Sequence, residues 1–99
     1  MDADVAIIGL GPAGLQAAIH AARKKVKVVA LGKSESSALN KAEVVNFFGI
    51  LSMAGPELLR IGREQAKNFG ATIVEEDVMK VVKDGDEFKI ITLRSGPRR

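Results

Sequence analysis

One segment of the sequence combines residue types and spacing that point to chemistry, the glycine-rich run at residues 9–14. Its order, Gly-Leu-Gly-Pro-Ala-Gly, matches the pattern G-x-G-x-x-G. In that pattern Gly9 permits a tight turn and Gly11 lets a pyrophosphate approach the backbone without a Cβ in the way. Gly14 lets a helix pack closely against a sheet. The run therefore predicts a site for the pyrophosphate of a dinucleotide.

The segments around these glycines are those that such a site requires. Val5–Ile8 is a short apolar run, typical of a strand that is buried on both faces of a parallel sheet. From Pro12 onward apolar residues recur at helical spacing, and Val26–Leu31 is a second β-branched run. Strand, helix and strand occupy about thirty residues, the usual length of a right-handed βαβ unit. The phosphates would lie at the helix N-terminus, where free N–H groups and the helix dipole favour negative charge.

The middle of the chain predicts a loop, a helix and a third strand. Residues 32–42 are polar and indicate a loop, and residues 44–50 are an apolar segment whose two phenylalanines are expected to pack inward. Gly55-Pro56 starts a helix that Gly70 ends, because proline suits the first turn and glycine suits the C-terminal cap. Ala71–Val74 then reads as a strand.

The last third of the chain predicts an antiparallel hairpin. Val78–Lys83 and Asp86–Leu93 flank Asp84-Gly85, a dipeptide typical of tight hairpin turns. With Asp84 and Gly85 as the loop, Val81 is expected opposite Phe88 and Met79 opposite Ile90. Residues 1–99 are thus expected to form one α/β domain, a Rossmann-like βαβαβ three-layer fold with a parallel sheet and a C-terminal antiparallel β-hairpin.

Composition excludes several classes of function. The chain has no cysteine, so it cannot by itself form disulfides, thiolate metal sites or a redox dithiol. His20 is the only histidine, and no nucleophile or acidic partner is identifiable near it, so we assign neither a catalytic residue nor a metal site. The net charge of +3 comes from scattered residues and does not favour nucleic acid. No apolar run reaches the ~18 residues of a membrane span and no signal peptide is visible, so a cytoplasmic location is the default expectation.

The position that usually binds the ribose departs from the common pattern. An acidic residue about 20 residues after the glycines, at the end of the second strand, normally accepts the ribose hydroxyls. This sequence has Leu31 and Gly32 there, and the nearest carboxylate is Glu35, a few residues later in a loop. Glu35 is therefore either a displaced ribose ligand or a solvated surface residue. The glycines, in turn, either bind a pyrophosphate or only form a tight strand-to-helix turn, and their βαβ context favours binding.

The segment from Asp4 to Arg23 resembles the N-terminus of the low-molecular-weight thioredoxin reductase family, within the pyridine nucleotide-disulfide oxidoreductases. Residues 43–49, Glu-Val-Val-Asn-Phe-Phe-Gly, are similar to that family's E-x-E-N-[WY]-P-G segment, and Gly55-Pro56 is similar to the start of its next helix. The resemblance implies the FAD-binding half of a two-domain flavoprotein. It places the pyrophosphate at Gly9, Gly11, Pro12, Ala13 and Gly14, the adenosine near Gly32 and Lys33, the flavin near Asn46, and the adenine against Val78.

The chain also departs from the family pattern. Ser36-Ser37-Ala38 stands where the family has Gly-Gly-Gln, Phe48 replaces a proline, and neither a Cys-x-x-Cys motif nor a nicotinamide domain is present. A FAD-binding oxidoreductase module that is not active alone is therefore the main expectation. The first alternative is an NAD(P)-binding module, in which Arg23 or Lys33 could meet a phosphate. The second is a non-catalytic structural or interaction domain that has lost the cofactor.

The resemblance further implies that a partner is needed. In the family's strand order, strands that this chain lacks would flank its first strand, which leaves Val5–Ile8 as an exposed apolar edge. Such an edge favours pairing or aggregation unless it is covered. We therefore expect a second copy, a separate subunit or the rest of a longer polypeptide to cover it.

Overall fold

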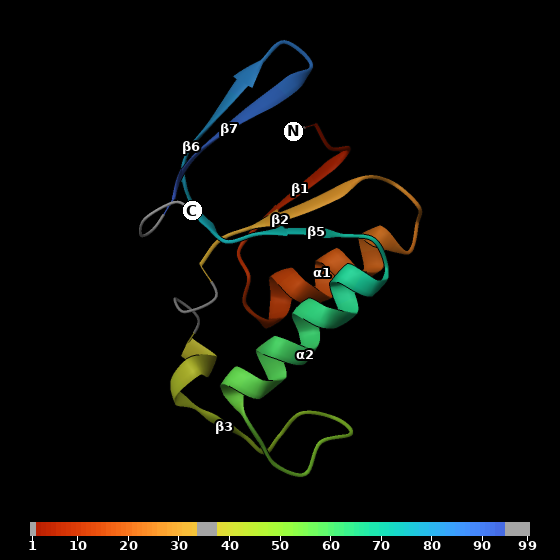
Figure 1. Ribbon diagram of the computed structural model, residues 1–99, viewed down its shortest axis with the longest axis vertical. Helices are drawn as coiled ribbons and strands as arrows, with labels where there is room; N and C mark the ends of the chain where they lie inside the picture. The colour runs from red at the N-terminus through yellow and green to blue at the C-terminus, as the bar shows by residue number, and fades with distance from the viewer. Residues whose placement is uncertain (1, 34–37, 95–99) are drawn as a thin grey trace.

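The computed structural model describes residues 2–33 and 38–94 (Figure 1). Its helices are α1 and α2, a short 3-10 helix lies between them, and seven segments form strands. In chain order the elements are β1 (Val5–Ile8), α1 (Pro12–Ala22), β2 (Val28–Leu31), the 3-10 helix η2 (Ala38–Lys41), β3 (Glu43–Val44), β4 (Met53–Ala54), α2 (Gly55–Asn68), β5 (Thr72–Val74), β6 (Glu76–Asp84) and β7 (Glu87–Arg94).

A parallel sheet in the order β1-β2-β5 forms the centre of the fold. Val5 pairs with Val28 and Ile8 with Leu31, while Leu31 also pairs with Val74. All four residues of β2 are buried, because this is the central strand and other elements cover both faces of the sheet (Figure 1). The predicted βαβ unit is confirmed. The carboxyl ends of all three strands meet at one edge of the sheet, and the glycine-rich turn follows β1 at that edge.

The sheet corrects one expectation about β1. We expected this strand to be buried on both faces, but its residues alternate between half-buried and exposed, and 54% of Ile8 is accessible. The reason is that β1 is an edge strand that pairs with β2 alone. Among the described residues, no strand pairs with the outer edge of β1.

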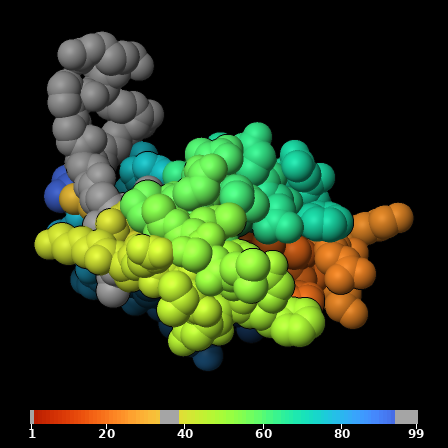
Figure 2. Space-filling view, turned by 90° about the horizontal axis from the view of Figure 1, so that it is seen from below, coloured from red at the N-terminus to blue at the C-terminus, as the bar shows by residue number. Residues whose placement is uncertain are grey.

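Both helices lie on one side of the sheet, and the hairpin of β6 and β7 stands on the other, so that the domain has three layers (Figure 1). Seen from the helix side, α2 covers the middle of the surface, with the β3–β4 region beside it (Figure 2). Small side chains let α1 approach the sheet closely. The core consists of the buried residues Leu10, Leu15, Ala18, Ala22, Val28, Ala30, Leu59, Ala66 and Ala71. Neither described helix is long and apolar enough to cross a membrane.

The hairpin forms as predicted, but its register differs from the prediction. Asp84 pairs with Glu87, which leaves Gly85 and Asp86 as the loop, and Val81 lies opposite Ile90 instead of Phe88. Gly85 has a φ of +65°, as glycine adopts at the first loop position of a type II′ turn. Met79 lies at a register shift between Val78 and Lys80, so it has no direct partner across the ribbon.

The apolar segment after β3 also differs from the prediction. We expected its two phenylalanines to pack inward, yet 47% of Phe47 and 99% of Phe48 are accessible. The segment forms a bend and a turn between the short strands β3 and β4, with Gly49 at a φ of +89°. A turn of this kind projects from the surface, and no described element packs over Phe48.

Near the start of α2, an ion pair between Glu57 and Arg60 lowers the pKa of the Glu57 carboxyl group. Arg60 Nε donates to Glu57 Oε1 at 2.7 Å, and this hydrogen bond, with the charge of Arg60, lowers the pKa of Glu57 below its usual 4.5. A carboxylate with a lowered folded pKa stabilises the fold above the unfolded pKa, and this contribution is lost as pH falls through the folded pKa. We expect Arg60→Gln to raise the pKa of Glu57, measured by NMR titration. An unchanged value would show that the pair does not persist in solution.

Candidate functional site

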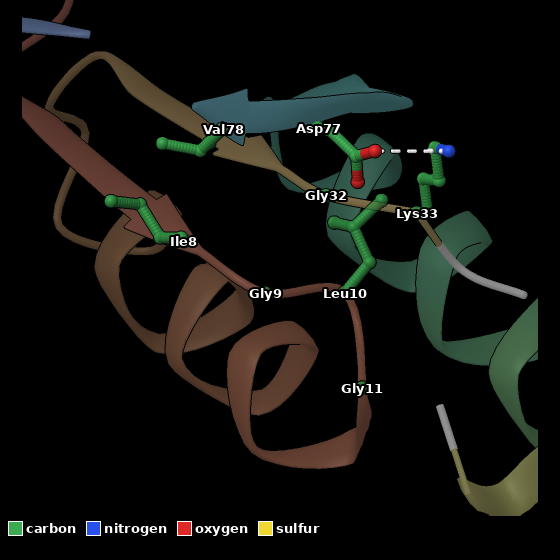
Figure 3. A pocket seen from close by; sticks show the side chains of 8 residues that line it. All are labelled: Ile8, Gly9, Leu10, Gly11, Gly32, Lys33, Asp77 and Val78. Carbon is green, nitrogen blue, oxygen red and sulfur yellow. Dashed lines mark ion pairs between the residues drawn. The ribbon is translucent and has the colours of Figure 1, made fainter. Parts of the chain in front are cut away.

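The site is a cavity of about 350 Å³ at the carboxyl-end edge of the sheet (Figure 3). Three segments line it: residues 8–11 after β1, residues 32–33 after β2, and residues 77–78 at the start of β6. Five residues that sequence reasoning had assigned to a dinucleotide lie together on this lining, namely Gly9, Gly11, Gly32, Lys33 and Val78. The cavity is at the small end of the range of about 300–1,000 Å³ that ligand pockets cover, which suits part of a dinucleotide.

The glycine-rich turn has the geometry that its pattern predicts. Gly9 has a φ of +122°, a conformation that residues with side chains rarely adopt. A Cβ on Gly14 would lie 2.0 Å from the carbonyl oxygen of Gly9, so α1 approaches the turn so closely that no side chain fits. Gly11 is the N-cap residue of α1, and no side chain caps the helix. The N-terminus of α1 therefore presents backbone donors that no side chain occupies.

The end of β2 passes directly against this turn. A Cβ on Gly32 would lie 3.2 Å from the backbone nitrogen of Leu10 and 3.3 Å from Gly9 Cα. Gly32 thus serves a packing role in addition to lining the cavity, and the close approach explains why a larger residue does not follow β2. Leu10, an unspecified position of the glycine pattern, is 2% exposed and belongs to the core. Sequence reasoning missed Leu10, although an apolar residue between two glycines is a signal for it.

An ion pair lines one side of the cavity. Lys33 Nζ lies 2.9 Å from Asp77 Oδ2, and both side chains are partly accessible (Figure 3). Asp77 was not among the predicted site residues. The signal that could have found it is its place just after β5, because residues that follow neighbouring parallel strands meet at the same edge of a sheet.

Other predicted residues lie elsewhere. Pro12 and Ala13 are exposed in the first turn of α1, beside the cavity but not on its lining. Asn46 is exposed between β3 and β4 and does not line the cavity. Glu35 falls outside the described residues, as do Ser36 and Ser37.

A second, smaller cavity of about 230 Å³ lies at the far end of α1 and is lined by His20, Arg23 and Lys24. Arg23 lies at the opposite end of α1 from the glycine-rich turn, so it is not part of the candidate site. Of Arg23 and Lys33, the two cations that could meet a phosphate, only Lys33 lines the site cavity. The described ranges 2–33 and 38–94 contain no group of three histidine or acidic residues that could hold a metal ion.

The parallel βαβ unit, with a glycine-rich turn and a cavity at the carboxyl ends of its strands, defines a Rossmann-type α/β protein. The family model described as pyridine nucleotide-disulphide oxidoreductase matches residues 3–96, and the chain belongs to this family.

Similar proteins include thioredoxin reductases. The chain is 40% identical over 94 residues to the thioredoxin reductase of Listeria monocytogenes, which covers 93% of this chain and 29% of that protein. It is 42% identical over 93 residues to that of Aquifex aeolicus, which covers 91% of this chain and 29% of that protein. The chain thus spans about 29% of the length of these relatives.

Solved structures of thioredoxin reductases superimpose on this chain. The thioredoxin reductase from Giardia duodenalis superimposes with a TM-score of 0.85 at 34% identity, over 91% of this chain and 30% of that one. A ferredoxin-flavin thioredoxin reductase from Clostridium acetobutylicum superimposes with a TM-score of 0.79 at 40% identity, over 93% of this chain and 33% of that one. These comparisons confirm the predicted fold class and the predicted family resemblance.

Proposed function

We propose that this chain binds the adenosine diphosphate part of FAD, as the FAD-binding module of a thioredoxin-reductase-like oxidoreductase. The observation that carries the proposal is the cavity itself, in which the glycine-rich turn, the uncapped start of α1 and the residues after β2 lie together. The pyrophosphate would lie against Gly9, Gly11 and the first turn of α1, which includes Pro12 and Ala13. Gly32, Lys33 and Val78 would surround the adenosine.

The residues present fit such a group. A Cβ on Gly14 would strike the turn, so the approach of α1 depends on glycine, and the first turn of α1 provides backbone donors for an anion without a basic side chain. Flavin as the cofactor is favoured by the family and by the name of the clostridial relative, which includes flavin. When bound, FAD supplies the redox chemistry, and this chain's residues bind and orient the adenosine end. A dithiol would come from outside residues 1–99, since these contain no cysteine.

The proposal includes a partner. The outer backbone edge of β1 carries no strand among the described residues, and Ile8 is exposed beside it. An open strand edge of this kind pairs readily with another chain. A second copy or a further segment of a flavoprotein would cover it and would also provide the surroundings of the flavin ring. A cytoplasmic location stays a sequence-based prediction.

The deciding experiment is a titration of the purified chain with FAD and then with NADH, followed by flavin absorbance and fluorescence. We expect saturable FAD binding that Gly11→Val reduces by at least about tenfold, which corresponds to 1.4 kcal/mol. Gly11 has a φ of −82° and a ψ of −171°, extended values that valine adopts freely, so the variant should fold and should only obstruct the phosphate.

Ala17→Val is the matched control, because it adds a valine to the exposed face of the same helix away from the cavity. Its affinity for FAD should equal that of the parent chain. Tight binding of NADH without retention of FAD would support the nicotinamide alternative. A folded chain that binds neither nucleotide would contradict the proposal and would favour a structural domain.

A further inference from the structure

The cavity contains a carboxylate that does not come from the usual place. In Rossmann-type sites the acid that accepts the ribose hydroxyls stands at the end of the second strand. Here Leu31 is 7% exposed and belongs to the buried β2, and Gly32 lies too close to Leu10 to carry a side chain without a shift. A side chain at residue 32 would therefore crowd the glycine-rich turn and strain a backbone whose φ is +154°.

Asp77 brings a carboxylate to the same cavity from a different strand. It lines the cavity beside Val78 at the start of β6, across from Gly32 (Figure 3). Its Oδ2 lies 2.9 Å from Lys33 Nζ, which fixes the direction of the carboxylate. Among the described residues, the Oδ2 contact with Lys33 is the one interaction recorded for this carboxylate, so Oδ1 is available to a ligand hydroxyl.

We propose that Asp77, positioned by Lys33, is the ribose-binding carboxylate of this site and that the pair selects adenine nucleotides with a free ribose 2′-hydroxyl over 2′-phosphorylated ones. This inference rests on the proposed function, because it assigns the adenosine end of the dinucleotide to this cavity.

The selection follows from the charges of the two side chains. A carboxylate accepts hydrogen bonds from a ribose diol and repels a phosphate, whereas a lysine by itself attracts a phosphate. In the pair, the charge of Lys33 is neutralised by Asp77 at 2.9 Å, so the cation is not free to recruit a 2′-phosphate. Removing the negative charge of Asp77 should therefore both weaken diol binding and remove the charge that repels a 2′-phosphate.

The test compares two probes, ADP-ribose and 2′-phospho-ADP-ribose, by isothermal titration calorimetry with the whole chain at low salt. We expect the parent chain to prefer ADP-ribose. We expect Asp77→Asn to weaken ADP-ribose about tenfold and to strengthen the 2′-phosphorylated probe, so that the preference falls by more than tenfold. Lys33→Met should weaken ADP-ribose, because Asp77 loses the partner that fixes its carboxylate, but should keep the preference, because Asp77 still repels the 2′-phosphate.

The matched control is Asp84→Asn, which removes the carboxylate of the ion pair with Lys89 (3.4 Å) near the hairpin turn. It changes the net charge of the chain equally, so it should leave the preference unchanged. Equal binding of both probes by the parent chain, or an unchanged preference in Asp77→Asn, would overturn the assignment of Asp77 while leaving the proposed function intact. If the folded parent chain bound neither FAD nor either probe, both the proposed function and the assignment of Asp77 would be overturned.

Discussion

Replacement of Gly14 by alanine is expected to destabilise the fold by about 3 kcal/mol, although the residue lies inside a helix. Glycine-to-alanine changes within helices normally stabilise by roughly 1 kcal/mol, because alanine has the higher helix propensity. Here the added Cβ would lie 2.0 Å from the carbonyl oxygen of Gly9 and 3.6 Å from Ile7 Cγ2. The nearer atom is backbone, so it cannot move aside as a flexible side chain could. The start of α1 would have to move away from β1.

Urea unfolding followed by circular dichroism measures this effect. The control is Ala17→Gly at an exposed position of the same helix, which reports helix propensity alone and should cost about 1 kcal/mol. Gly14→Ala and Ala17→Gly would then both destabilise α1, the first through steric conflict and the second through loss of helix propensity. If Gly14→Ala were as stable as the parent chain, the close approach between α1 and the glycine-rich turn would be wrong.

The sequence predicted those features that depend on local rules. The glycine pattern between an apolar run and a helical run specifies the βαβ unit. Gly32, Lys33 and Val78 were named through the family resemblance, and they line the same cavity as Gly9. Start and stop signals located α2 well, with Gly55 at its first residue and Gly70 just after its end. These residues act through their own backbone conformations, which a sequence pattern records directly.

Features that depend on contacts between distant segments were not predictable. The hairpin register depends on whether Gly85 is the first or the second residue of the two-residue loop. Glycine is favoured at the second position when the loop is Asp84-Gly85 and at the first when it is Gly85-Asp86, so the sequence alone allows both registers. Phe48 was expected inside because of its apolar character, but burial requires a neighbouring element, and the turn between β3 and β4 offers none among the described residues. Asp77 enters the site only because β6 passes beside the end of β2.

Truncation of Leu10 is expected to lower both stability and nucleotide affinity, because this residue belongs to the core and to the site at once. Its side chain is 2% exposed and packs within the core cluster, while its backbone nitrogen approaches Gly32. Leu10→Ala should cost about 2–5 kcal/mol, the range for leucines in well-packed cores. For a domain of this size, whose total stability is of the order of 5–15 kcal/mol, that is a large fraction.

The control for Leu10→Ala removes the same atoms from the surface. Leu51 is 96% exposed, so Leu51→Ala should change the free energy of unfolding by no more than about 0.5 kcal/mol. Under conditions where both variants stay folded, only Leu10→Ala should weaken ADP-ribose binding, because the glycine-rich turn loses the side chain that holds it against the core. Equal unfolding midpoints in urea for the two variants would contradict the burial of Leu10. A destabilised Leu10→Ala chain with unchanged affinity would show that the turn keeps its geometry through its backbone contacts with Gly14 and Gly32 alone.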